Sequence, residues 1–320
     1  MQYGEISYVK KPVSRILYGT AMAPFNVGGD GNALFDAMYA LGINAFDTAR
    51  VYGEAECVLG RWIEERGLRD KVVILSKCAH PLPDGTKRVC EKEIRADFQI
   101  SSECLRTDYI DIYLAHRDDK EMPVGEIVEA FNALHAESKI GAFGGSNWTH
   151  RRIEEANEYA YKHDMLPFTV SSPNFGLAEQ VKDLWGGGSI SISGPSGAEA
   201  RKWYVKEQMP VVAYSSLGRG LFSGKLKSTE AAHADKVLDE FSMKGYAYPQ
   251  NFERLKRCEE LAAEKGCSVS QIAMAWLFRQ KLNTFAVVST SKARRMQENI
   301  KAMELELTRS ELNYLDLQEN

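Results

Sequence analysis

The chain has 320 residues, of which 44% are hydrophobic and 26% charged, and its net charge at pH 7 is −4. This composition is typical of a globular protein with a sizeable core, and it gives no indication of a nucleic-acid or acidic-membrane partner. No apolar stretch approaches the roughly 18 residues that a transmembrane helix needs. The first residues lack the apolar segment of a secretory signal, so we expect a soluble, cytoplasmic protein.

Cysteine spacing indicates neither a metal site nor a disulfide framework. No Cys-x-x-Cys pair and no Cys/His cluster with zinc spacing is present, so no metal ligands are predicted. We expect reduced thiols, as is typical of a cytosolic protein. The six cysteines are Cys57, Cys78, Cys90, Cys104, Cys258 and Cys267.

Eight short runs rich in Val, Ile, Leu, Phe and Tyr predict β-strands. Most lack strict apolar–polar alternation, a pattern typical of parallel strands buried on both faces. The fifth run is weak by itself and is supported mainly by its place in the series. In chain order the runs are residues 15–20, 43–48, 72–77, 110–116, 142–147, 168–174, 210–216 and 285–290.

Segments with helical periodicity separate these runs. Residues 54–67 begin with acidic residues and end with basic ones and a glycine, which fits a helix macrodipole and a C-terminal stop. The first dozen residues predict a short hairpin. Further helices are predicted at 90–106, 124–139, 149–163 and 298–306, with another beginning near Ala198.

The alternation of strands and helices predicts an α/β fold, a (β/α)₈ TIM barrel, as a single domain over residues 1–320. In the first part of the chain the strands recur at roughly thirty residues, the size of one βαβ unit. Residues 185–203 form a Gly/Ser-rich loop, and a long loop of about 217–250 follows the seventh strand. Such loops often bind ligands, although a tolerated surface insertion is the alternative.

Four polar residues lie at or just after the ends of predicted strands: Asp47, Tyr52, Lys77 and His116. Strand ends on one face of a parallel barrel meet around a common site. A lysine beside a tyrosine lowers the pKa of the phenol and prepares it for proton transfer. Each residue alone is more often a cap, a turn or a solvated group, but their order on successive strands indicates a shared catalytic pocket.

Motifs spread over roughly residues 15 to 315 resemble those of the aldo-keto reductases. The most specific is Asp-Thr-Ala-x-x-Tyr-Gly at 47–53, followed by Glu and Leu-Gly. The other matching segments are LSK, DYIDIYLAHRDD, IGAFGGSNW, VVAYSSLGRGLFSGK and ENIKAMELELT. The resemblance implies an NAD(P)H-dependent oxidoreductase that reduces an aldehyde or ketone to an alcohol.

The chemistry of the four residues agrees with this resemblance. Tyr52 is the expected proton donor, since a phenol tuned by Lys77 can serve as an acid. Asp47 can hold Lys77 and keep it charged. His116 can orient the substrate carbonyl through a hydrogen bond. The resemblance implies the same roles at these positions.

The cofactor is expected to bind on the barrel itself, because no Gly-x-Gly-x-x-Gly motif follows a strand. The resemblance implies a nicotinamide dinucleotide, with Tyr214 stacking on the nicotinamide ring. Ser172 stands where many members have a glutamine. The remaining residues expected near the nicotinamide and pyrophosphate are Gly19, Thr20, Ser146, Asn147, Ser215, Leu217 and Gly218.

The segment after the eighth strand is the expected adenosine end of this site. Hydroxyls, amides and Lys292 at a helix start can bind a 2′-phosphate, which favours NADP(H), with NAD(H) as the alternative. An ordinary solvated basic helix start is the other interpretation. The residues implied are Ser289, Thr290, Ser291, Lys292, Arg295, Glu298 and Asn299.

The substrate is expected to be a small-molecule carbonyl or alcohol held by loops after several strands. The Gly/Ser-rich loop at 186–197 could also reach it. Ordinary packing is an equally good interpretation of the candidate residues, and neither the natural substrate nor the oligomeric state can be read from them. The candidates are Met22, Phe25, Val51, His80 and Trp148.

Two other functions are possible on the same barrel. A nicotinamide-binding sensor would need the fold and the cofactor but little turnover. A lyase could use Lys77 as a Schiff base, although Asp47, Tyr52 and Tyr214 would then have no role.

Overall fold

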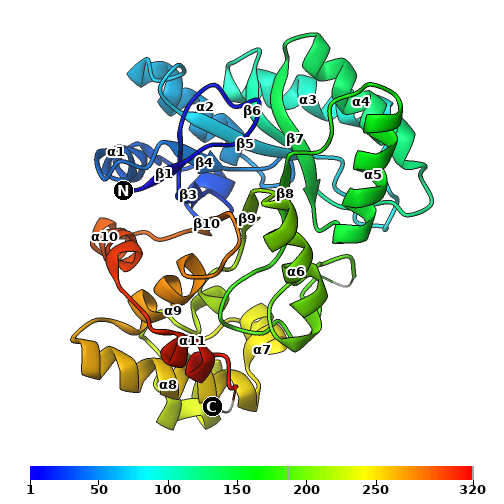
Figure 1. Cartoon of the computed structure of the whole chain (residues 1–320). Helices are drawn as coiled ribbons and strands as arrows, with labels where there is room; N and C mark the ends of the chain where they lie inside the picture. The colour runs from blue at the N-terminus through cyan, green and yellow to red at the C-terminus, as the bar shows by residue number, and fades with distance from the viewer. Residues whose placement is uncertain (186, 319–320) are drawn as a thin grey trace. The chain divides into compact units, whose positions relative to one another are not determined.

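The computed structural model describes residues 1–185 and 187–318, and it contains a closed barrel of eight strands with helices around it (Figure 1). This confirms the predicted (β/α)₈ TIM barrel. The strands are ordered β10-β3-β4-β5-β6-β7-β8-β9. Their bounds are β3 Ile16–Gly19, β4 Ala45–Asp47, β5 Val73–Cys78, β6 Ile110–Ala115, β7 Ile140–Ser146, β8 Val170–Ser172, β9 Val211–Ala213 and β10 Thr284–Val288.

All eight predicted strand runs contain a strand, and the predicted N-terminal hairpin is present as β1 (Tyr3–Gly4) paired antiparallel with β2 (Val13–Ser14). The helices predicted at 54–67, 90–106, 124–139 and 149–163 and near Ala198 are also found, as α2 Ala55–Arg66, α3 Glu91–Leu105, α4 Val124–Ala136, α5 His150–Lys162 and α6 Ala198–Glu207. The helix predicted at 298–306 overlaps α10 Ala293–Lys301. The helices that the sequence patterns did not predict are α1 Asn32–Ala40, α7 Glu240–Tyr246, α8 Pro249–Lys265, α9 Val269–Phe278 and α11 Arg309–Leu315.

Two predicted segments differ in detail. The last predicted helix starts earlier than expected, because α10 begins at Ala293, and the 3₁₀-helix η5 (Ala302–Glu304) follows it. The long loop expected over 217–250 contains short helices: η3 Gly218–Gly220, η4 Ser228–Lys236, α7 and the first residues of α8. In the Gly/Ser-rich segment, Gly186 lies outside the described residues, and η2 (Pro195–Gly197) leads into α6.

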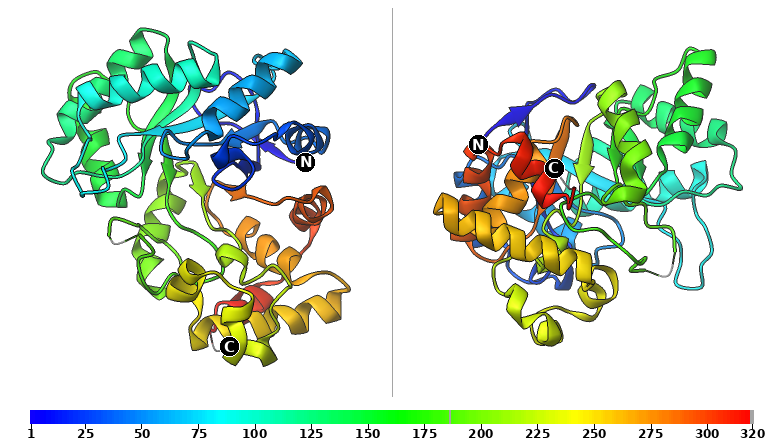
Figure 2. Two further views of the ribbon diagram at one scale, coloured as in Figure 1. Left: turned by 180° about the vertical axis from the view of Figure 1, so that it is seen from behind. Right: turned by 60° about the horizontal axis from the view of Figure 1, so that its bottom comes forward.

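The contacts within the chain form two compact units, which we describe separately. Unit 1 comprises Met1–Ser172 and Met209–Val212, and unit 2 comprises Pro173–Gln208 and Ala213–Asn320. In unit 1, neighbouring strands from β3 to β8 pair in parallel. Helix α2 packs on α3, α3 on α4 and α4 on α5, and these helices lie outside the strands (Figures 1 and 2).

The core of unit 1 includes an aromatic cluster beneath the loop after β3. Phe25 stacks on Phe35 at 4.5 Å between ring centroids and packs edge-on against Tyr18. Phe35 in turn contacts Phe46 and Trp62. Large buried rings of this kind dominate core energetics, so this cluster anchors the start of the loop that precedes α1.

A disulfide joins Cys57 of α2 to Cys104 of α3, so the expectation of six reduced thiols was wrong for this pair. The reason is tertiary: α2 and α3 lie so close together that a Cβ added to Gly60 would be 2.3 Å from the carbonyl oxygen of Cys104. A sequence separation of 47 residues gives no sign of this contact. Among the described residues, Cys78, Cys90, Cys258 and Cys267 are free.

Unit 2 is mostly helical apart from β10 and the end of β9. Helix α8 packs on α9 and on α11, while α9 also contacts α10 and η5. Helix α7 lies against η3 and η4. No helix among residues 1–185 and 187–318 is long and apolar enough to cross a membrane.

Candidate active site

Asp47 and Lys77 form a buried ion pair at the ends of β4 and β5. Asp47 is the last residue of β4, and Lys77 is the penultimate residue of β5. The Lys77 ammonium donates to Asp47 Oδ1 at 2.6 Å and to the Thr48 carbonyl oxygen at 2.9 Å. Burial would lower the pKa of Lys77, but attraction to Asp47 and Tyr52 outweighs it and raises that pKa. Lys77 is therefore a fixed cation at neutral pH.

Tyr52 lies beside this cation and, unlike Asp47, Lys77 and His116, it is partly exposed. The positive charge of Lys77 favours the ionised form of Tyr52, and the Lys77 ammonium lies 5.1 Å from the centre of the phenol ring. Burial raises the pKa of Tyr52 by more than Lys77 lowers it. The expected net lowering was therefore wrong: Tyr52 holds its proton at neutral pH, and Lys77 limits the cost of losing it.

The backbone around Tyr52 requires a glycine at the next position. Gly53 has φ +57°, and a Cβ added there would lie 2.3 Å from the Asn26 carbonyl oxygen. The Tyr52 amide donates to Ala49 O, and Tyr52 O accepts from the Ala55 amide at the start of α2. Close approach to the loop after β3 and the start of α2 thus fix the position of the phenol.

His116 follows β6 directly, and its imidazole contacts Tyr52. The two ring centroids are 5.7 Å apart in an edge-to-face arrangement, and the His116 amide donates to Cys78 O at 2.8 Å. Burial, followed by the positive charges of Lys77 and Arg117, holds the pKa of His116 well below its ordinary value. The ring is therefore neutral. Its Nδ1 is buried without a hydrogen-bond partner among the described residues.

The four predicted catalytic residues, which we call the tetrad, thus come together within unit 1, although they are up to 69 positions apart in the chain (116 − 47). The sequence patterns missed the Thr48 carbonyl, which holds the lysine, and the buried Glu56, whose Oε1 accepts from Ser76 Oγ at 2.5 Å on the strand that carries Lys77. A backbone carbonyl has no side-chain signal. Glu56 could have been noticed only as an acidic residue among the apolar positions of α2.

Predicted cofactor residues of unit 1 lie on the same strand ends. Asn147 Nδ2 donates to Ser146 Oγ at 3.1 Å and to His116 O at 3.4 Å, so this pair is linked directly to His116. Ser146 Oγ donates to Ser172 O, and Ser172 Oγ donates to Val212 O. Gly19 and Thr20 also lie beside the tetrad, because Gly19 pairs with Asp47 in register and Thr20 Oγ1 donates to Asp47 O.

In unit 2, Tyr214 is held through its backbone by Asn174. Asn174 Nδ2 donates to Tyr214 O at 3.4 Å and to the Tyr246 hydroxyl at 2.8 Å. Tyr214 itself is partly exposed. The next residues form a tight turn in which Ser215 has φ +55° and Gly218 has φ +58°.

The predicted adenosine segment of unit 2 forms the start of α10. Ser291, Lys292 and Arg295 are exposed there, as is Ser289, and Thr290 Oγ1 accepts from the Lys292 amide. Glu298 is half-buried. Asn299 is buried, and its Oδ1 has no hydrogen-bond partner among the described residues. The helix start therefore presents donors and cations to solvent, with a buried amide oxygen nearly two turns further along the helix.

The predicted substrate residues fall into two groups. Phe25 and Trp148 are fully buried: Phe25 belongs to the aromatic cluster, and Trp148 donates from Nε1 to Arg117 O and packs on Phe168. Val51 is 48% exposed beside Tyr52, and Met22 and His80 are half-buried. His80 contacts His116, with 4.9 Å between the ring centroids.

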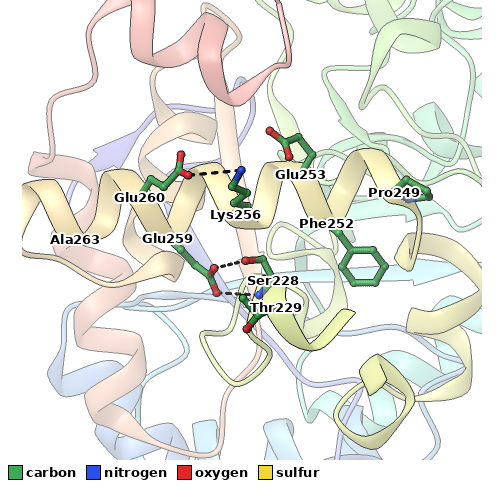
Figure 3. A pocket seen from close by; sticks show the side chains of 9 residues that line it. All are labelled: Ser228, Thr229, Pro249, Phe252, Glu253, Lys256, Glu259, Glu260 and Ala263. Carbon is green, nitrogen blue, oxygen red and sulfur yellow. Dashed lines mark hydrogen bonds and ion pairs between the residues drawn. The ribbon is translucent and has the colours of Figure 1, made fainter. Parts of the chain in front are cut away.

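A surface cavity of about 650 Å³ lies in unit 2 between η4 and α8 (Figure 3). Lys256 pairs with Glu260 at 3.9 Å, and Ser228 donates to Glu259 at 2.5 Å, so these polar groups bind one another. None of the predicted catalytic or cofactor residues lines it. The lining residues are Ser228, Thr229, Pro249, Phe252, Glu253, Lys256, Glu259, Glu260 and Ala263.

Comparison with known proteins gives matches over most of the chain. The chain is 26% identical to the uncharacterized oxidoreductase YrpG of Bacillus subtilis (strain 168), over 99% of this chain and 95% of that protein. It is 27% identical to a putative voltage-gated potassium channel subunit beta of Schizosaccharomyces pombe (strain 972 / ATCC 24843), covering 89% and 86%. It is 24% identical to the aldo-keto reductase str7 of Strobilurus tenacellus, covering 87% and 78%.

The model of the Aldo/keto reductase family matches residues 15–318, which include the tetrad and every predicted cofactor residue. Members of this family are oxidoreductases that generally use nicotinamide cofactors and act on small molecules. The chain therefore belongs to the aldo/keto reductase family, and it is an oxidoreductase.

Proposed function

We propose that this oxidoreductase uses NADP(H) to reduce an aldehyde or ketone to an alcohol, with Tyr52 as the proton donor. The observation that carries the proposal is the shared lysine: Lys77 binds the Asp47 carboxylate and also favours the ionised form of Tyr52. A phenol that is protonated at neutral pH, partly exposed and next to a fixed cation suits an acid that protonates an alkoxide.

In the proposed reaction, the side chains of this protein supply the proton that is added to the carbonyl oxygen. A bound nicotinamide supplies the hydride that attacks the carbonyl carbon. As negative charge develops on the carbonyl oxygen, Tyr52 transfers its proton to that oxygen, and the Lys77 ammonium stabilises the phenolate left behind. Asp47 keeps Lys77 charged, neutral His116 orients the carbonyl, and a solvent proton then restores Tyr52. In the reverse oxidation, the phenolate accepts the alcohol proton.

The side chains present fit a nicotinamide dinucleotide. Ser146 and Asn147 offer a hydroxyl and an amide, linked to His116 O, for a carboxamide group. At α10, Ser291, Lys292 and Arg295 are exposed where helix amides favour anions, and Asn299 Oδ1 is a buried acceptor without a partner. The cations Lys292 and Arg295 at this helix start favour NADP(H) over NAD(H) because they can bind a 2′-phosphate.

A catalytically weak sensor is the second candidate, because one relative is named as a putative potassium channel subunit beta. The tetrad argues for the enzyme, since a pure binding protein does not need a buried ion pair beside an accessible phenol. Titration with NADPH and NADH, followed by tryptophan fluorescence, tests both functions. Reduction of a panel of aldehydes and ketones then separates them: binding without turnover would leave only the sensor, and no binding would exclude both.

The coenzyme preference has its own test at α10. Lys292→Met removes one of the cations at the helix start, and we expect the Kd for NADPH to rise about 10- to 100-fold, the effect of losing one hydrogen bond to a charged group. The Kd for NADH should change little, because NADH lacks the 2′-phosphate. Lys301→Met, in the last turn of the same helix, is the matched control. Equal effects of Lys292→Met on both nucleotides would contradict the NADP(H) assignment.

A further inference from the structure

His80 is held in place by a strained turn directly after β5. Ala79 has φ +57°, an uncommon conformation for a non-glycine residue, and its amide donates to Asp97 Oδ2 at 2.7 Å. Arg88 bridges the same carboxylate and the His80 carbonyl oxygen, at 3.0 and 3.4 Å. Backbone strain of this kind is typical of functional positions, and the ion pair between Arg88 and Asp97 holds the turn that carries His80.

This turn places the His80 imidazole against the catalytic histidine. The rings of His80 and His116 are edge-to-face with centroids 4.9 Å apart, and His116 makes the next edge-to-face contact with Tyr52. The three rings are contiguous. His80 therefore contacts one of the two residues that would bind the substrate carbonyl in the proposed reaction.

The hydrogen bonding of His80 determines its tautomer. Nδ1 lies 2.9 Å from the Pro81 carbonyl oxygen. A carbonyl oxygen can only accept, so Nδ1 carries the hydrogen. Burial, followed by the positive charges of Arg117 and Arg88, lowers the pKa of His80 and keeps the ring neutral. Nε2 is then the hydrogen-bond acceptor of the ring.

We propose that His80 Nε2 accepts a hydrogen bond from a hydroxyl group on the carbon next to the reacting carbonyl, so that His80 selects α-hydroxy aldehydes and ketones. This inference rests on the proposed carbonyl reduction. Tyr52 and His116 supply donors to the carbonyl oxygen, whereas His80 supplies an acceptor beside them. A substrate with an acceptor and an adjacent donor matches this arrangement, and its deoxy analogue leaves Nε2 without a partner.

The test compares lactaldehyde with propanal, which differ by the proposed hydroxyl, with benzaldehyde as a third substrate. We expect the protein to have a kcat/KM about tenfold higher for lactaldehyde, the value of one neutral hydrogen bond. His80→Leu should reduce this ratio to near one. His80→Gln, which keeps an acceptor oxygen, should restore part of it. An unchanged ratio in His80→Leu would overturn the inference.

The tautomer is measured independently by long-range proton–nitrogen correlation NMR, with the His80 signals assigned by their loss in His80→Gln. A hydrogen on Nδ1 of His80 supports the inference. A hydrogen on Nε2 overturns it, whatever values of kcat/KM are measured, because Nε2 could not then accept a hydrogen bond. If the protein reduces benzaldehyde but has equal kcat/KM for lactaldehyde and propanal, the proposed selectivity is refuted and the carbonyl reductase function is not. Failure to reduce any of the three would refute the carbonyl reductase function, and the selectivity with it.

Discussion

Strand β6 has a polar cluster at each of its ends, and the two clusters differ in how completely their charges are paired. Near its start, Asp111 is buried and pairs with Lys11 at 2.7 Å and Arg69 at 2.9 Å. Asp111 Oδ2 also accepts from the Ile74 amide. Two cations and an amide thus surround one carboxylate, which ties the segment after β1 to the strands of unit 1.

Just after the end of β6, the charges are less completely paired. Asp47 has one cation, Lys77, and that cation also favours the ionised form of Tyr52. His116 keeps an unpartnered Nδ1, and Tyr52 is partly exposed. The comparison teaches that a buried ion pair by itself indicates a structural role. A catalytic role is indicated where the cation of the pair also interacts with a group that can contact a ligand.

The largest expected effect distinguishes the tyrosines of the two clusters. Tyr52→Phe removes the proton donor, so kcat for carbonyl reduction should fall about 10²- to 10⁴-fold, the usual contribution of a general acid. NADPH affinity should persist. Tyr109→Phe is the matched control, because Tyr109 lies over Arg69 at the other cluster and its ring is retained. Steady-state kinetics check both variants, and full turnover in Tyr52→Phe would remove Tyr52 from its role.

The second prediction compares the lysines. Lys77→Met leaves Asp47 buried without a cation, and we expect the free energy of unfolding to fall by about 3–5 kcal/mol. Lys11→Met should cost less, about 1–3 kcal/mol, because Arg69 remains bound to Asp111. Denaturant unfolding of both variants measures the difference. A larger loss in Lys11→Met would show that the Asp111 cluster depends on Lys11 more than its geometry indicates.

The third prediction concerns acid stability and His116. The pKa of His116 in the folded protein is well below 6.5, so the unfolded chain binds a proton first as the pH falls. Stability that is present above pH 6.5 should decline below it, by up to about 1.4 kcal/mol per pH unit. His116→Gln should show a shallower decline. Unfolding midpoints between pH 7 and pH 5 test this, and parallel curves would contradict a buried neutral imidazole.

The smallest expected effect concerns Glu56, which joins α2 to β5 one residue before Lys77. Burial raises the pKa of Glu56 above its ordinary value of 4.5, and the Ser76 hydrogen bond opposes part of that shift. Its stabilising contribution is complete below pH 4.5 and is lost as the pH rises through the raised pKa. Glu56→Gln cannot ionise, so its stability should fall less between pH 5 and pH 8. An identical fall in both proteins would show that Glu56 is ionised throughout.

Local patterns predicted the secondary structure well, because apolar runs and helix ends are local properties. Gly67 ends α2 in the left-handed conformation, as its place after basic residues indicated. Prediction was poorer where local signals are weak: η3 and η4 occupy a segment that reads as loop, and α10 begins five residues before the predicted 298. Short helices of this kind depend on packing in unit 2, which sequence periodicity does not report.

For the candidate site, the sequence by itself determined which side chains stand at the ends of β4, β5 and β6, since strand direction and register follow from the alternation of strands and helices. Only the tertiary structure decided the protonation states of these side chains and the residues that they contact. It raised the pKa of Tyr52 despite Lys77, turned His80 toward His116 and brought Cys57 to Cys104. The physical reason is that burial and contacts between distant segments depend on packing in three dimensions, which no local pattern encodes.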